Sequence, residues 1–160
     1  MLKDYGHMAA ELAPADQSQR DRLQSLAGKV RDFTEFLAEL GPLVPQHEVP
    51  MKATYHDACH LCHAQKIAQQ PRDLLGMVRG LELLPLAESS ICCGAAGSYN
   101  LTEPDMAARL GRRKAGHILD SGARAVISAN AGCTLQIQAV LRESGRPLPV
   151  LHPAEILDAA

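Results

Sequence analysis

Aromatic residues are scarce in this sequence, and tryptophan is absent. Phenylalanine and tyrosine together make up 3% of the 160 residues, and 18 acidic side chains against 16 basic ones leave a formal net charge of -2. Proteins that bind nucleic acids rely on a positive field that attracts phosphates and, for single strands, on aromatic side chains that stack on bases. The composition therefore predicts no nucleic-acid partner.

Long hydrophobic runs are also missing. No stretch reaches the roughly 18–20 consecutive apolar residues that a membrane-spanning helix requires, and the first seven residues hold no apolar core of a secretory signal. Hydrophobic residues nevertheless make up 46% of the chain, which together with the low net charge excludes intrinsic disorder. We expect a folded cytoplasmic protein without a membrane span, with any membrane association running through its partners.

Motifs that would indicate an independent enzyme are absent as well. The sequence contains neither a Gly-x-Gly-x-x-Gly fingerprint nor a phosphate-binding loop, so a nucleotide-dependent reaction is not supported. Asp57 and Glu103 are not arranged as the paired carboxylates of a hydrolytic site. The sequence therefore supports neither a nucleotide-dependent enzyme nor a hydrolase with paired carboxylates.

The chain divides into two parts near residue 50. Apolar residues at three- and four-residue spacing predict one helix from a cap at Asp16 to about Leu40, with its apolar stripe turned to the core. Residues 1–15 lack such periodicity and are expected to form an irregular leader. A linker rich in proline follows the helix. We therefore predict an N-terminal helical segment and linker over residues 1–50 and a cysteine-rich α/β domain over residues 51–160.

Short strands and amphipathic helices alternate in the second part. Strands are predicted over 52–56, 81–86, 125–128 and 149–152, and helices over 63–79, 103–119, 134–143 and from 153 onward. Such alternation with short connections predicts an α/β fold, a parallel sheet flanked by helices. Ligands of such sheets gather at the carboxyl ends of the strands.

Five cysteines distinguish this sequence: Cys59, Cys62, Cys92, Cys93 and Cys133. An odd number without an export signal disfavours a disulfide framework. Single buried thiols are common in protein cores, but the adjacent pair followed by Gly94 is not a packing pattern. The cysteines form three groups that follow three predicted strands, so we expect them to meet at one edge of the sheet. The predicted site consists of Cys59, Cys92, Cys93 and Cys133.

Four thiolates suit either an iron–sulfur cluster or a tetrahedral zinc ion. We favour the iron–sulfur cluster, and zinc or an empty, reversibly oxidised thiol site remain alternatives. A turn opened by Gly94 allows both adjacent cysteines to face one centre. Cys59 to His63 also match Cys-x-x-Cys-His, the haem-attachment signature, but haem would leave the adjacent pair unexplained. Cys62 is therefore interpreted as a spare thiol beside the site.

Histidines and basic residues near these cysteines have two interpretations each. His56 and His60 are first taken as solvated or capping residues, and alternatively as hydrogen-bond partners of the bound sulfur. The basic run on the helix over 103–119 is first taken as a solvated face, and alternatively as a docking surface for an acidic flavoprotein. That run consists of Arg109, Arg112, Arg113 and Lys114.

Several segments resemble the cysteine-rich CCG domain. They are residues 55–61, 71–75, 92–102 and 132–133, and among CCG proteins they are most similar to the carboxyl-terminal module of the iron–sulfur subunit of glycolate dehydrogenase (glycolate oxidase). Heterodisulfide reductase and lactate-utilisation proteins contain related domains. In the full pattern the last motif is Cys-x-x-Cys, whereas here Asn130 takes the first of those positions. The whole glycolate dehydrogenase subunit also has a ferredoxin-like region and a second module, which this sequence lacks.

The resemblance implies a function in electron transfer. A cluster, of the 4Fe–4S type, would be bound by Cys59, Cys92, Cys93 and Cys133. A partner subunit containing flavin would oxidise glycolate to glyoxylate, and electrons would leave through iron–sulfur centres toward the quinone pool. The chain would then be a non-catalytic subunit, or part of one, in an oxidoreductase complex. The alternative from another class is a structural or interaction domain that zinc or bare thiols stabilise, without redox turnover.

Overall fold

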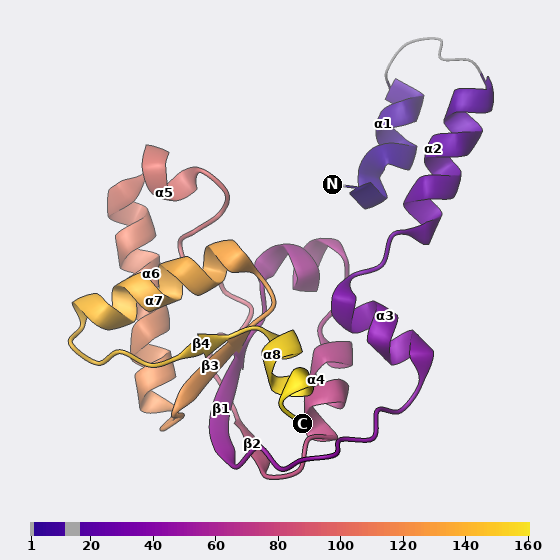
Figure 1. The fold of residues 1–160 in the computed structure, drawn as a ribbon. Helices are drawn as coiled ribbons and strands as arrows, with labels where there is room; N and C mark the ends of the chain where they lie inside the picture. Colours follow the sequence, from indigo (N-terminus) through magenta and orange to yellow (C-terminus); the bar gives the residue numbers. More distant parts are fainter. Residues whose placement is uncertain (1, 12–16) are drawn as a thin grey trace.

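One parallel sheet forms the centre of the molecule (Figure 1). The computed structural model describes residues 2–11 and 17–160. Four strands lie side by side in the order β2-β1-β3-β4, and each neighbouring pair is parallel. They are β1 (Met51–His56), β2 (Leu81–Leu84), β3 (Ala125–Ser128) and β4 (Val150–Leu151). The α/β class predicted from the sequence is confirmed.

Helices cover both faces of this sheet, as Figure 1 shows. On one side lie α3 (Phe33–Leu40), α4 (Gln69–Gly76) and α8 (Pro153–Asp158), and on the other lie α6 (Pro104–Asp120) and α7 (Ala131–Glu143). Successive strand residues point to opposite faces, so Val126 packs in the cluster with Ile118 and Ile137 while Ile127 packs with Leu75. No helix in the described ranges is long and apolar enough to cross a bilayer.

The order in which successive strands join the sheet changes direction at β1: β2 is added on one side of β1, and β3 and β4 on the other. After β1 the chain crosses through α4 to β2 on one side, and it then returns through α6 to β3 on the other side of β1. Loops that follow two such strands diverge and leave a crevice at their carboxyl ends, which is where ligands of open α/β sheets bind. His56 and Ser128, the last residues of β1 and β3, lie opposite each other in register at this point.

Helix α7 begins three residues earlier than its predicted start at 134. Its cap is Asn130, whose side-chain oxygen accepts a hydrogen bond from the backbone N–H of Cys133 at 3.0 Å. Asparagine is among the best N-cap residues because it satisfies an N–H that the helix leaves free. Cys133 therefore lies in the first turn of the helix, with its backbone fixed by Asn130.

The predicted helix over 63–79 divides ahead of Pro71. A π-helical turn, η2 (His60–Ala64), follows the first cysteine, and α4 then starts at Gln69. Pro71 lies in the first turn of α4, where a missing backbone N–H costs no helical hydrogen bond. A further short helix, α5 (Tyr99–Thr102), precedes α6.

The prediction of one helix up to Leu40 is wrong. The chain forms α2 (Gln17–Lys29) and then restarts as α3, because Asp32 and Glu35 make a capping box at the second start. The predicted cap Asp16 lies outside the described residues. Apolar side chains of the expected core stripe are also 40–65% exposed, so the stripe does not face the core; these are Leu26, Phe33, Phe36 and Leu40.

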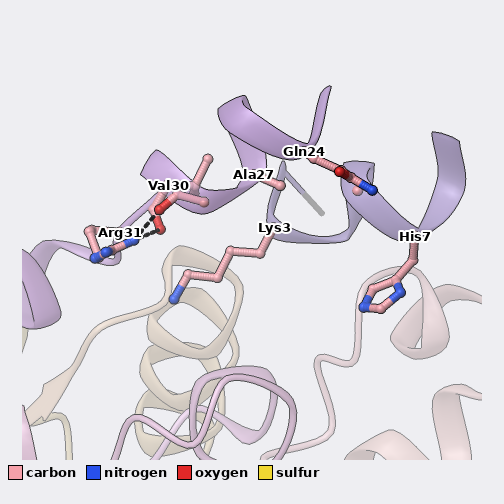
Figure 2. Close-up of a pocket in the computed structure, with 8 residues that line it drawn as sticks. Lys3, His7, Gln24, Ala27, Val30 and Arg31 are labelled. Atoms are coloured by element: carbon pink, nitrogen blue, oxygen red, sulfur yellow. Dashed lines mark hydrogen bonds between the residues drawn. The ribbon is translucent and has the colours of Figure 1, made fainter. Parts of the chain in front are cut away.

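The first residues are helical where an irregular leader was predicted. They form η1 (Leu2–Asp4) and α1 (Tyr5–Glu11), which packs beside α2 (Figure 1). A cavity of 480 Å³ lies between these two segments, and Lys3, His7 and Arg31 are among the residues that line it (Figure 2). All residues lining the cavity come from positions 3–31, so it is separate from the cysteine loops.

An ion pair anchors the loop that leaves β1. The Asp57 carboxylate, which is buried, accepts two hydrogen bonds from the Arg72 guanidinium of α4, at 2.6 and 2.7 Å. Arg72 also lies 5.0 Å from the centre of the Tyr55 ring. Burial alone would raise the pKa of Asp57, but the hydrogen bonds and charge of Arg72 hold that pKa below its ordinary value.

We expect Arg72→Met to destabilise the protein by about 3 kcal/mol at pH 7, because a buried carboxylate loses its partner. A carboxyl group with a lowered folded-state pKa adds stability above its unfolded pKa of about 3.9, and this stability is lost as pH falls through the folded value. The difference in the free energy of unfolding between wild type and variant, measured by urea titration, should therefore become smaller between pH 5 and pH 3. A difference that stays constant over this range would contradict the Asp57–Arg72 ion pair as its cause.

Gly94 lets the loop that contains Cys92 and Cys93, called the cysteine loop below, pack closely against the backbone of α6. Its φ angle is +96°, and a Cβ atom at this position would lie 2.4 Å from the backbone oxygen of Ala107 in α6. Gly97 also has positive φ, +66°, but nothing lies within 4 Å of its Cβ position. We expect Gly94→Ala to reduce the free energy of unfolding by about 2–3 kcal/mol and Gly97→Ala by only about 1 kcal/mol. Equal losses in urea titrations would show that contact with α6 is unimportant.

Candidate metal centre

Three donor side chains from three parts of the chain meet at the carboxyl edge of the sheet. His56 ends β1, Cys93 follows β2, and Cys133 lies at the start of α7 after β3. One ligand atom from each lies within 4.8 Å of the other two, and all three residues are buried. The sheet topology thus brings together residues that are up to 77 positions apart in sequence.

Cys59 and Cys92, two of the predicted ligands, are half-buried and lie outside this three-donor group. Burial raises the pKa of the Cys92 thiol, and the neighbouring Cys93 and Cys59 raise it further. The backbone N–H of Gly94 donates to the Cys92 sulfur at 3.3 Å and acts in the opposite direction. The charges of Cys59, Cys92 and Cys93 all act on Cys133. The four thiols are therefore close enough to influence one another's ionisation.

Cys93 and Cys133 share a hydrogen bond and titrate as a pair. The Cys133 thiol donates to Cys93, which lowers the pKa of Cys93, and the His56 ring and the backbone N–H of Ala95 lower it further. The same hydrogen bond raises the pKa of Cys133. Two thiols that lie side by side in a buried environment, such as Cys93 and Cys133, cannot both ionise easily. Without a metal, the two sulfurs would therefore share one proton rather than both ionise.

His56 is buried at the centre of the group, contrary to its interpretation as a solvated residue. Its exposed fraction is 0%, and neither ring nitrogen has a hydrogen-bond partner among the described residues. The Ser128 hydroxyl across the register is unpartnered as well within the same described ranges. A buried polar group without a partner costs about 1–3 kcal/mol. Thiolates and an imidazole left available in this way form a donor set that zinc and iron–sulfur centres accept.

Lys114 is a second residue whose burial was not predicted from the sequence. It was assigned to a solvated face, but it is only 2% exposed and its ammonium group donates to the backbone oxygens of Glu88 and Ser89. Burial lowers its pKa, whereas the nearby negative charges of Cys93 and Glu88 raise it. The periodicity of α6 carried the signal, because Lys114 follows the buried Ala107 and Gly111 at helical spacing. Arg109, Arg112 and Arg113 are exposed.

Cys62 lies in η2 and is not part of the three-donor group. It is half-buried, and its charge acts on Tyr55 and Arg72. In the same turn, a ring nitrogen of His63 lies 3.2 Å from the backbone oxygen of Ser90. Binding of one metal centre by Cys59, Cys92, Cys93 and Cys133 stays a prediction, since the structure carries no ligand.

Comparison with known proteins identifies the family. The model of the CCG family, described as a cysteine-rich domain, matches residues 53–138, which include all five cysteines. Lactate utilization protein A of an Exiguobacterium species is 35% identical over 159 residues, covering 99% of this chain and 63% of that protein. Lactate utilization protein A of Shouchella clausii is 32% identical over 160 residues, covering 99% and 65%.

The chain thus spans just under two thirds of the length of these relatives. Their names point to lactate utilization, so the comparisons support the CCG resemblance without supporting the narrower one to glycolate dehydrogenase. The match over 53–138 includes most of β1, all of β2 and β3, and the loops that bring the cysteines together. The chain belongs to the family of cysteine-rich CCG domain proteins.

Proposed function

We propose that the chain is an iron–sulfur electron-transfer module of a complex that oxidises a 2-hydroxy acid. The observation that carries this proposal is the meeting of His56, Cys93 and Cys133 within 4.8 Å, with the Cys59 and Cys92 thiols beside them. The relatives named for lactate utilization support a redox role. The module is non-catalytic, because substrate oxidation takes place on a partner subunit that contains flavin.

The cluster, of the 4Fe–4S type, is held by Cys59, Cys92, Cys93 and Cys133, and when bound it supplies one-electron transfer. The protein prepares these ligands before the cluster arrives. Asn130 fixes the backbone of Cys133, and the Gly94 N–H is directed at the Cys92 sulfur. Hydrogen bonds to sulfur and nearby charge tune the potential of such centres. Lys114 supplies a positive charge that offsets the thiolates.

The partner subunit determines which acid is oxidised. The relatives' names favour lactate, while the sequence motifs resemble a glycolate dehydrogenase subunit. The two acids differ by one methyl group and release electrons in the same way, so the task of this module is the same for both. Electrons pass on toward a quinone acceptor. The protein acts in the cytoplasm and reaches a membrane through its partners, and residues 1–50 and 51–160 form the helical segment and the cysteine-rich domain.

A second candidate is a structural zinc site without redox turnover. Two ligands of one tetrahedral zinc lie about 3.3–3.8 Å apart, given Zn–S and Zn–N bonds of about 2.3 and 2.0 Å. The three-donor group, with all separations within 4.8 Å, needs little movement to reach this spacing. This observation favours zinc over an empty thiol site.

Metal analysis of anaerobically purified protein distinguishes the two candidates. After reconstitution with iron and sulfide, we expect about four iron atoms per chain and a broad visible absorption that dithionite bleaches reversibly. Lactate or glycolate alone should produce no bleaching, since the flavin partner is needed. Stoichiometric zinc, with no iron uptake and no visible chromophore, would contradict the iron–sulfur proposal.

Two cysteine variants test the ligand set. Cys93→Ser should lose nearly all bound iron, because Cys93 is a fully buried sulfur of the three-donor group. Cys62→Ser should retain the wild-type iron content, because Cys62 is not in the proposed set; the charge of Cys59, by contrast, acts on both Cys92 and Cys133. Iron and sulfide contents, measured per folded chain, provide the readout. Equal losses in both variants would make Cys62 a ligand and refute the proposed set.

Lys114 offers a test of the electrostatics. Lys114→Met removes a buried positive charge near Cys93, so the reduced, more negative centre becomes less stable. We expect the midpoint potential to fall by roughly 60 mV, which is tenfold in equilibrium for a one-electron couple. Arg112→Met, which removes an exposed charge from the same helix, is the matched control and should change the potential much less. Equal potentials in Lys114→Met and wild type would rule out this role.

A further inference from the structure

We propose that His56 is a fifth donor of the centre and binds the metal through a ring nitrogen. The inference rests on the proposed function, because it concerns the same centre that the four cysteines hold. It changes the chemistry of that centre from all-sulfur to mixed sulfur and nitrogen.

The position of His56 in the sheet directs its side chain to the cysteines. Tyr55 packs in the cluster on the α4 and α8 face, and alternation along the strand turns His56 to the opposite face. Cys93 and Cys133 belong to the core cluster on that face. His56 is also the last residue of β1, a central strand with β2 and β3 on either side. The His56 side chain therefore points into the crevice between the loops that follow β1 and β3, where the strand order changes direction.

Apart from the Cys93 sulfur, which lies close enough for the His56 ring to lower the pKa of Cys93, no described group accounts for a fully buried imidazole at this point. Neither ring nitrogen has a hydrogen-bond partner within the described ranges. The adjacent Asp57 carboxylate is occupied by Arg72, and the Lys114 ammonium is directed to backbone oxygens of Glu88 and Ser89. Buried polar groups in folded proteins almost always have a partner. A bound metal would give one nitrogen of His56 a partner, which no well-formed hydrogen bond from the described protein groups provides.

The donors within reach support the same assignment. Asn130 occupies a cysteine position of the full Cys-x-x-Cys pattern, and its side-chain oxygen already accepts from the Cys133 N–H. Position 130 therefore gives the centre no thiol, although the full pattern has a cysteine there. His56 lies within 4.8 Å of both the Cys93 and the Cys133 sulfur. It is a buried donor within reach of the two buried sulfurs of the centre.

Pulsed electron paramagnetic resonance on the reduced, reconstituted full-length chain tests this assignment. Protein made with ¹⁴N-histidine should show a strongly coupled nitrogen, and protein made with ¹⁵N-imidazole histidine should show the corresponding ¹⁵N signal. This labelling experiment uses the wild-type chain, so it does not depend on how a variant folds. His56→Gln should lose the coupling and should release iron to a chelator about tenfold faster than wild type. His60→Gln is the matched control, since His60 lies beside Cys59 but outside the three-donor group.

The outcomes separate this inference from the proposed function. A wild-type cluster with no strongly coupled histidine nitrogen, or with coupling that His60→Gln removes, overturns the role of His56 and leaves the electron-transfer proposal standing. If wild type takes up no cluster, the proposed function fails, and the same chains are loaded with cobalt(II) alone. An unchanged cobalt absorption spectrum in His56→Gln would then overturn the ligand assignment, and a changed spectrum would support it in a single-ion site.

Discussion

Parallel alignment of β1, β2 and β3 is the constraint on which the candidate centre depends. Parallel strands end at the same edge, so the residues that follow them meet although they are far apart in sequence. Placing β1 between β2 and β3 makes its last residue, His56, completely buried. Gly94 then lets the cysteine loop press against α6, and Asn130 starts α7 so that Cys133 faces the same point. Each of these local features acts only because the sheet order has brought the loops together.

The concentration of sulfur at this edge creates an electrostatic problem that the structure solves in part. Buried thiolates repel one another and lose hydration, so the Cys93 and Cys133 pair shares a single proton in the metal-free state. Lys114 adds a buried positive charge on the α6 side. Neither ring nitrogen of His56 makes a well-formed hydrogen bond with a described residue, and burying them in this way costs free energy. A metal centre of the kind proposed would neutralise the thiolates and occupy the imidazole together.

Much of the fold could be predicted from the sequence, because hydrophobic runs and turn residues act locally. The strand over 125–128 and the helix over 104–120 follow directly from such patterns. The start of α7 was missed because Asn130 was considered as a substitute for a cysteine and not as a helix cap. The break between α2 and α3 was missed because the apolar spacing continues across Asp32, whose capping box with Glu35 decides the local structure.

The thiol groups were placed correctly at strand ends, but the burial of His56 depends on sheet order, which short-range patterns do not contain. Lys114 was missed because its charge was given more weight than its helical position among buried residues.

The central claim is that this sheet edge holds an iron–sulfur cluster in the working protein. X-ray absorption at the iron and zinc edges, on protein purified without oxygen or added metal, tests it most directly. The account predicts an iron edge whose fine structure shows a sulfur shell together with a short iron–iron distance, at a stoichiometry of one cluster per chain. A zinc edge with a sulfur and nitrogen shell, and no iron above background, would contradict the account.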